Sequence, residues 1–304
     1  FDADVPPDIV ATDPFEKLGS AGPKVAPPEA LFAPERKNSL GFDLADPLIL
    51  ESLQAGRTVT RDWDFGTQGS LQSIVSPSNG QNIGQVRFIS PQQAKSMIEG
   101  AQPWSDTPQV RAGVLQNVAD LYEQNADELF ALLTHEAGKT LIDCIGEVRE
   151  AVDFFRYYAE QAKIYDASAN GLITCISPWN FPLAIFSGQI AAALAAGNGV
   201  LAKPAESTSM IAHFAAKLMH QAGVPKPSLQ LVAGFGAEIG PTLCSHSKVT
   251  GVCFTGSMVT AQAINKTMAR ALPAHVPLGC PCSPCILCRR NHVMQPEKNK
   301  YFLV

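Results

Sequence analysis

The chain has 304 residues, of which 46% are hydrophobic and 17% are charged. At roughly 150 residues per domain, this length predicts about two domains, and the composition excludes a disordered, collagen-like or coiled-coil chain. The 23 basic and 28 acidic residues leave a formal net charge of −5. They form no basic stripe, so nucleic acid is not expected as a partner. Because the sequence opens on Phe1, we expect it to be a piece of a longer protein.

The first part of the chain is rich in proline. Residues 1–48 hold eight of the 23 prolines and no long apolar period, which predicts an extended, poorly packed linker. Residues 74–88 then predict two strands joined by a turn at Asn79-Gly80. Residues 91–165 predict helices, because apolar side chains recur there at intervals of three and four.

From Gly171 onward, short apolar strands alternate with helices. The predicted strands cover residues 172–176, 200–202, 229–232 and 249–254. The predicted helices cover residues 182–196, 209–222, 236–245 and 257–269. Repeated units of this length predict an α/β fold, a Rossmann-type parallel sheet with helices on both faces.

A charge-free stretch and the cysteines bear on the location of the protein. Residues 168–202 carry no charge and are long enough to cross a bilayer. Two prolines, Pro178 and Pro182, interrupt the stretch, which favours a buried strand, a turn and a helix over a transmembrane segment. The first 279 residues hold scattered thiols with no export signal, which predicts a reducing cytoplasm: Cys144, Cys175, Cys244 and Cys253.

Three short motifs follow predicted strands and could bind a nucleotide. Residues 234–240 (Gly-Phe-Gly-Ala-Glu-Ile-Gly) open a helix, although the last glycine is one position late for a dinucleotide fingerprint. A tight turn that needs glycine for positive φ is the alternative. Residues 254–257 (Phe-Thr-Gly-Ser) predict either an anion site or an ordinary Ser257 N-cap. Lys203 and Glu206 predict either hydrogen bonds to ribose hydroxyls or a solvated pair.

The most specific motif is Pro-Trp-Asn-Phe-Pro at residues 178–182. Its two prolines fix a turn directly after a buried strand, and the amide of Asn180 could donate a hydrogen bond to a developing oxyanion. A purely structural turn is the alternative.

In this order and spacing, the four motifs resemble the NAD-binding half of the aldehyde dehydrogenase superfamily. Residues 34–44 and 151–158 (Ala-Val-Asp-Phe-Phe-Arg-Tyr-Tyr) resemble, more narrowly, the glutamate-semialdehyde dehydrogenase modules of bifunctional proline-utilisation enzymes. The resemblance implies a domain over residues 49–270, NAD as cofactor and a small aldehyde as substrate. It also implies a flavin-dependent proline dehydrogenase domain upstream in the parent protein, and it leaves homo-oligomerisation open.

The resemblance assigns roles to individual residues. Asn180 matches the catalytic amide that polarises the aldehyde oxygen, Phe181 an aromatic beside the substrate, and Glu150 a carboxylate near the substrate pocket. Lys203 and Glu206 match the groups that hold the adenosine ribose, and a carboxylate there suits NAD better than NADP. The other NAD-binding residues that it implies are Ile176, Pro178, Trp179, Gly236, Gly240, Phe254, Gly256 and Ser257. It implies no metal site.

Residues 271–304 depart from this pattern. The family continues past this point with a Glu-x-Gly-Gly segment that carries the general base and a Gly-Gln-x-Cys segment that carries the nucleophile. Neither occurs here, so we expect the catalytic domain to be missing and the fragment to be inactive unaided. A shifted reading frame is the interpretation that we favour for this tail, and a zinc or iron–sulfur site at its four crowded thiols is the alternative: Cys280, Cys282, Cys285 and Cys288. A non-catalytic NAD-binding module is the other alternative function.

Overall fold

A computed structural model describes residue 6 and residues 25–164, 168–271 and 278–279. Its small sheet runs in the order β1-β3-β2, from the strands Trp63–Phe65 (β1), Ser70–Val75 (β2) and Asn82–Phe88 (β3). Strands β2 and β3 are antiparallel. Gly80 has a φ of +71° in the turn between them, and its N–H donates to the Ser76 carbonyl at 2.8 Å. The hairpin predicted at Asn79-Gly80 is therefore confirmed.

The larger sheet has five strands in the order β6-β5-β4-β7-β8. They are Leu172–Ile176 (β4), Gly199–Lys203 (β5), Leu229–Leu231 (β6), Val249–Phe254 (β7) and Leu278–Gly279 (β8). All four neighbouring pairs are parallel, which confirms the Rossmann-type prediction. The chain steps from β4 to β5 and β6, then returns to β7 on the other side of β4. The switch point of the sheet therefore lies between β4 and β7, where ligands bind in open α/β sheets.

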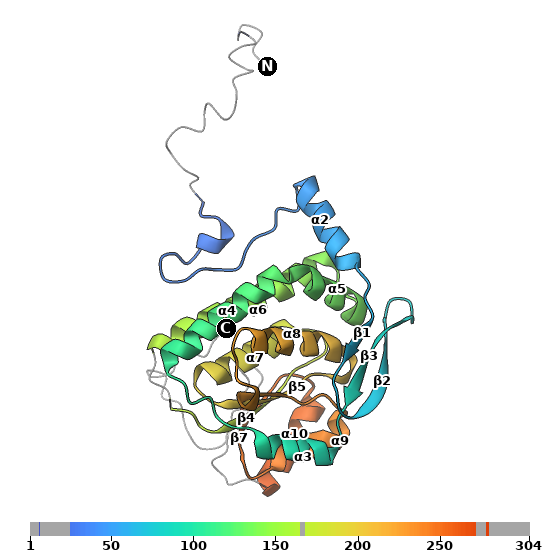
Figure 1. Ribbon diagram of the computed structural model, residues 1–304, viewed down its shortest axis with the longest axis vertical. Coiled ribbons are helices and arrows are strands. Elements are labelled where there is room, and N and C mark those ends of the chain that lie inside the picture. Colours follow the sequence, from blue (N-terminus) through green and yellow to red (C-terminus); the bar gives the residue numbers. More distant parts are fainter. Residues whose placement is uncertain (1–5, 7–24, 165–167, 272–277, 280–304) are drawn as a thin grey trace.

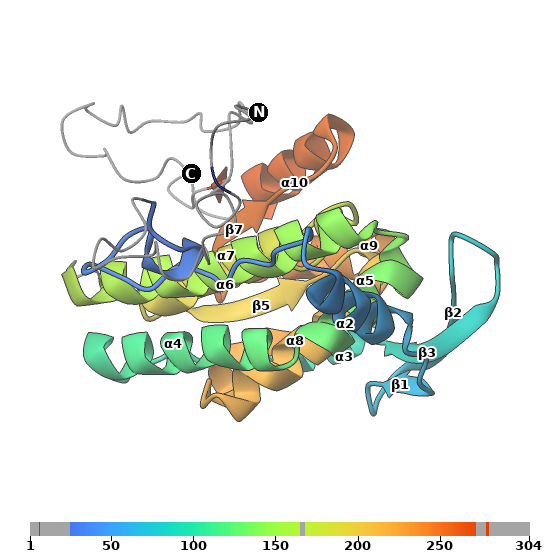
Figure 2. The same ribbon diagram turned by 90° about the horizontal axis from the view of Figure 1, so that it is seen from above.

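Helices cover both faces of this sheet (Figure 1). On one side lie Pro108–Gln124 (α4), Ala126–Ala137 (α5), Leu141–Ile164 (α6), Ala184–Ala195 (α7) and Ser209–Gln221 (α8). On the other side lie Pro91–Gly100 (α3), Gly236–Ser245 (α9) and Met258–Ala271 (α10). Short 3-10 helices cover Pro28–Ala30 (η1), Glu206–Thr208 (η2) and Lys226–Ser228 (η3). Figure 2 looks onto the first of these helical layers, in which α4 and α6 lie in front of β5.

The alternation of side chains along β5 creates two apolar cores. Val200 and Ala202 belong to the core shared with α4 to α8, whereas Leu201 belongs to the core under α3, α9 and α10. All three side chains are fully buried. A strand buried on both faces is continuously apolar, and this is why residues 200–202 could be recognised as a strand in the sequence.

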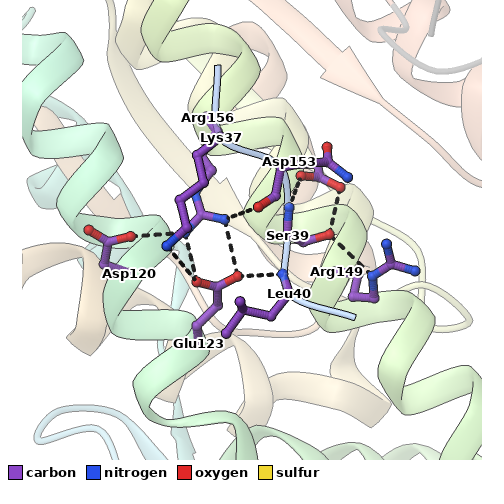
Figure 3. Close-up of polar contacts among 9 residues, drawn as sticks. Lys37, Ser39, Leu40, Asp120, Glu123, Arg149, Asp153 and Arg156 are labelled. Atoms are coloured by element: carbon purple, nitrogen blue, oxygen red, sulfur yellow. Dashed lines mark hydrogen bonds and ion pairs between the residues drawn. The ribbon is translucent and has the colours of Figure 1, made fainter. Parts of the chain in front are cut away.

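The segment before helix α2 (Pro47–Thr58) packs closely against α4 and α6 (Figure 3). Arg156, which is 4% exposed, donates to the Asn38 carbonyl at 2.7 Å and to the Glu123 carboxylate at 2.7 Å. The backbone N–H and the hydroxyl of Ser39 donate to the Asp153 carboxylate at 2.7 and 2.8 Å. These contacts fix residues 38–40 against both helices.

The expectation of a poorly packed segment is therefore wrong for residues 38–44. Phe42 and Leu44 pack against the core, and the ring of Phe42 lies 5.9 Å from that of Phe130 in an edge-to-face arrangement. The proline content of this segment does not reveal that its partners, Asp153 and Arg156, lie more than 100 positions later in the sequence. The boundary of the predicted linker at residue 48 stays a prediction.

The charge-free stretch of residues 168–202 forms β4, a turn, α7 and most of β5. In the part of the chain that the structure describes, no helix combines the length and the apolar character that a membrane span requires.

Candidate functional site

Four parallel strands bring their carboxyl ends to one edge of the sheet, and each of the four motifs follows one of these ends. Hydrogen bonds join the strand ends directly. The Ser177 N–H donates to the Lys203 carbonyl at 3.1 Å, and the Thr255 N–H donates to the Ile176 carbonyl at 3.1 Å. The sequence therefore places its candidate residues along a single edge, on either side of the switch point.

Lys203, Glu206 and Gly236 form a compact polar cluster at the ends of β5 and β6. The Gly236 N–H donates to Glu206 Oε1, and Lys203 Nζ lies 3.7 Å from the same oxygen. Lys203 Nζ also donates to the Pro204 carbonyl at 3.0 Å. The Lys203 side chain is only 5% exposed, whereas that of Glu206 is 41% exposed. The solvated-pair alternative is therefore wrong for Lys203, whereas Glu206 keeps part of its carboxylate exposed to solvent.

The two charges of the cluster respond differently to their surroundings. Burial lowers the pKa of Lys203, and the Glu206 carboxylate only partly opposes this effect. Burial by itself would raise the pKa of Glu206, but the Lys203 charge and the Gly236 N–H outweigh it, so this pKa falls. Glu206 thus stays an ionised acceptor for a donor such as a hydroxyl.

Two glycines of the motifs, Gly236 and Gly256, lie where a side chain would be crowded. A Cβ on Gly236 would lie 3.1 Å from Glu206 Oε1, and a Cβ on Gly256 would lie 2.7 Å from the Phe254 ring. Gly234 and Gly236 both lack positive φ, so the alternative of a tight turn that needs left-handed glycine is wrong. Gly240 has open space around it, and nothing in its surroundings requires glycine.

Ser257 begins helix α10. Its hydroxyl oxygen accepts a hydrogen bond from the Thr260 N–H at 3.2 Å, and its carbonyl accepts from Ala261 N–H at 3.0 Å. This is an N-cap, as one of the two alternatives predicts. A contact between Ser257 and a nucleotide stays a prediction.

The turn at residues 178–182 exposes its three central side chains. Trp179 is 61% exposed and Phe181 is 41% exposed. Asn180 is also exposed, and its amide makes no hydrogen bond among the residues that the structure describes. An amide with a free N–H group is suited to donate to an oxygen that gains negative charge.

Two functional candidates that the sequence analysis missed lie behind this turn. Lys139 Nζ is 3.0 Å from Glu147 Oε1 and 4.6 Å from the centre of the Phe181 ring. Glu147 is 2% exposed and lies in α6. Its helical spacing from the apolar residues Cys144 and Ala151 puts it on the buried face, and this spacing could have revealed it.

Glu150 lies one turn of α6 after Glu147. The protein atoms around its carboxyl group and the Glu147 carboxylate raise its pKa, whereas Lys139 lowers it. Glu150 therefore interacts electrostatically with Lys139, the cation that contacts the Phe181 ring. Glu150 and Glu147 thus both interact with the Lys139 charge, and a role of Glu150 in binding a substrate stays a prediction.

Among the described residues, no group of three or more His, Cys, Asp or Glu side chains could hold a metal ion. The clustered cysteines of residues 280–288 lie outside the described residues, and so does almost all of the predicted tail.

A parallel sheet with polar and glycine-rich loops at its switch point defines a dinucleotide-type α/β domain. The sequence profile of the aldehyde dehydrogenase family matches residues 63–288. The chain therefore belongs to the aldehyde dehydrogenase family, whose members are NAD-dependent oxidoreductases. The match runs past residue 270, and the division of the chain at that point stays a prediction.

Individual relatives show to which members of the family the chain is similar. Bifunctional protein PutA of Klebsiella aerogenes is 41% identical over 300 residues, which cover 89% of this chain and 23% of that protein. The 1-pyrroline-5-carboxylate dehydrogenase of Geobacillus thermodenitrificans is 32% identical, with 69% of this chain and 45% of that protein covered. The crystal structure of a PutA mutant from Bradyrhizobium japonicum matches with a TM-score of 0.71 at 36% identity. It covers 86% of this chain and 26% of that one, so the chain spans about a quarter of its PutA relatives.

Proposed function

We propose that the chain is the nucleotide-binding portion of an NAD-dependent L-glutamate γ-semialdehyde dehydrogenase of proline breakdown. The family and the names of the PutA and 1-pyrroline-5-carboxylate dehydrogenase relatives support this substrate class. The observation that carries the proposal is the Lys203–Glu206–Gly236 cluster at the carboxyl edge of the sheet.

The cluster fits the ribose of NAD. The Lys203 ammonium and the Glu206 carboxylate offer a donor and an acceptor to a pair of ribose hydroxyls. Gly236 has no side chain, so the cradle beside these groups stays open to a ligand. The negative charge of Glu206 disfavours the extra phosphate of NADP. When bound, NAD supplies the hydride acceptor of the reaction.

Asn180 is the proposed hydrogen-bond donor to the substrate. Its exposed amide donates a hydrogen bond to the aldehyde oxygen and stabilises the negative charge that develops there. We propose that Phe181, in the same turn, and Glu150, in α6, contact the substrate. The thiolate and the general base have no matching segments in the 304 residues. We therefore propose that the chain binds NAD and oxidises no aldehyde by itself. In the parent protein, a proline dehydrogenase domain is the proposed partner.

Calorimetric titration of the purified chain with NAD and with NADP tests the proposal. We expect NAD to bind more tightly than NADP, and Glu206→Gln to weaken NAD binding by about ten- to a hundredfold, the cost of a hydrogen bond to a charged group. Glu51→Gln is the matched control, because Glu51 is an exposed acid of α2 and lies outside the four motifs. Addition of L-glutamate γ-semialdehyde should give no NADH. Absence of NAD binding, or equal effects of the two variants, would overturn the proposal.

A further inference from the structure

The amide of Asn180 has no anchor of its own. Asn180 is exposed and makes no hydrogen bond among the described residues, so the backbone of the turn at residues 178–182 alone fixes its position. A group that stabilises charge must be held within about 0.5 Å of its productive position. The residues that hold this turn therefore control what Asn180 can do.

The turn is held at both of its ends. At its start, the Ser177 N–H donates to the Lys203 carbonyl of the neighbouring strand at 3.1 Å. At its end, Glu147 Oε2 accepts hydrogen bonds from the Leu183 and Ala184 N–H groups at 3.2 and 2.8 Å. Leu183 is the N-cap residue of α7 and has no capping side chain of its own. A carboxylate from α6 thus takes the place of the missing cap.

Lys139 connects this cap to the middle of the turn. Its ammonium lies 3.0 Å from Glu147 Oε1, the oxygen that the helix does not use, and 4.6 Å from the centre of the Phe181 ring. A cation at this distance is attracted to the face of an aromatic ring, and more strongly where water is excluded. The Lys139 side chain is 15% exposed and that of Glu147 is 1% exposed, so the ion pair is largely shielded from solvent.

The end of helix α5 fixes Lys139 in this place. Gly138 ends the helix with a left-handed φ of +67°, which residues with a side chain rarely adopt. The Lys139 N–H then donates to the Leu133 carbonyl at 3.1 Å. The backbone of Lys139 is therefore anchored, and only its long side chain spans the distance to the turn.

We propose that Lys139 is a positioning residue for Asn180. One ammonium group contacts both the carboxylate behind the turn and the aromatic ring within it, so it sets the position of the turn relative to α6. The role given to Asn180 rests on the proposed function. The effect of Lys139 on the turn does not depend on NAD and is measured without it.

Trp179 reports on the turn directly. It is 61% exposed, whereas Trp63 and Trp104 are 5% and 2% exposed. Fluorine NMR of the chain labelled with 5-fluorotryptophan gives one line for each tryptophan, and Trp179→Phe assigns the line of the turn. We expect Lys139→Met to displace only the Trp179 line, and Lys139→Arg to restore it. The matched control is Lys163→Met, because Lys163 is also a lysine paired with a glutamate, 2.7 Å from Glu160, on the surface of α6.

The comparison of lines decides the proposal. A Trp179 line in folded Lys139→Met that coincides with the wild-type line would overturn it, and so would Lys139→Arg displaced as far as Lys139→Met. If Lys139→Met does not fold, Lys139→Gln takes its place, because it removes the same charge. We expect a displaced Trp179 line in this variant too, and an unmoved line would overturn the proposal. Failure of the wild-type chain to bind NAD would instead overturn the proposed function and leave this comparison standing.

Discussion

The first N–H groups of helices α7 and α8 donate hydrogen bonds to a buried carboxyl group from a neighbouring helix. Glu147 of α6 accepts from the Ala184 N–H of α7 at 2.8 Å, and Glu136 of α5 accepts from the Ile211 N–H of α8 at 2.8 Å. The two side chains are 2% and 3% exposed. Each carboxylate meets the positive end of a helix dipole, so the local device is the same in the two regions.

The two caps differ in their charged partners. Lys139 pairs with Glu147 at 3.0 Å, whereas no cationic side chain in the described ranges pairs with Glu136. Burial raises the pKa of both carboxyl groups, and it raises that of Glu136 to about 8 against the backbone N–H groups that oppose it. Lys139 opposes this rise in pKa at Glu147, whereas no cation in the described part of the chain opposes it at Glu136. The cap with a cation is also the one that borders the proposed site.

The largest expected effect separates the two caps by a double-mutant cycle. Glu147→Ala leaves Lys139 and two N–H groups without their acceptor, which should lower the free energy of unfolding by about 3–5 kcal/mol. Combined with Lys139→Met, it should show a coupling energy of about 0.5–3 kcal/mol, because the two side chains are in contact. Urea unfolding of the single and double variants measures both quantities.

Glu136→Ala provides the control for this cycle. It removes the same kind of cap but breaks no ion pair with Lys139, so its coupling to Lys139→Met should be clearly smaller than that of Glu147→Ala. Coupling of equal size in the two cycles would mean that Lys139 stabilises the whole helical layer and has no special relation to α7.

The second expected effect is a pH dependence of the unpaired cap. The pKa of Glu136 is about 8 in the folded chain, above the value of about 4.3 for a solvated glutamate. The folded state keeps a proton that the unfolded state has released, so stability falls as the pH rises between these values and levels off above the folded pKa. The slope for one proton is at most about 1.4 kcal/mol per pH unit.

Glu136→Gln removes the titrating group and keeps an acceptor for the helix. The difference between the wild-type and variant stabilities should therefore shrink from pH about 5 to about 8. Other carboxyl groups with raised pKa values, such as Glu147, are present in both proteins and cancel in this difference. Parallel stability curves for the two proteins would contradict an uncharged Glu136 at neutral pH.

Much of the sheet could be predicted from the sequence because its strands are buried on both faces. The predicted strands 172–176 and 249–254 and the helix 236–245 have the bounds that the structure gives them. Apolar period and glycine or proline boundaries are local signals. The position of the motifs at one edge followed from the parallel order of the strands.

The polar contacts that hold the site together could not be predicted in this way. Ser39 and Asp153, which are hydrogen-bonded, are 114 positions apart in the sequence, and Glu147 and Ala184 are 37 positions apart. Periodicity reports which face of a helix is buried, but it does not report which element lies opposite. Lys139 follows a helix-ending glycine and has no local pattern that marks it as a partner of Phe181.

The smallest expected effect concerns α10, the last of the four helices that begin at this edge of the sheet, whose cap is neutral and exposed. Ser257→Ala removes the hydroxyl that accepts from the Thr260 N–H, which should cost about 1 kcal/mol. This loss should be independent of pH, because a hydroxyl carries no charge, and Ser257→Asp should recover most of it, since aspartate caps as well as serine. A loss as large as that of Glu147→Ala would contradict the distinction between exposed and buried caps. Calorimetric titration with NAD adds a second readout. If Ser257 also contacts NAD, Ser257→Ala should weaken NAD binding in the fully folded chain. Ser257→Asp should restore stability but still weaken NAD binding, because its charge repels the phosphates, so this pair of variants separates the cap from the ligand contact.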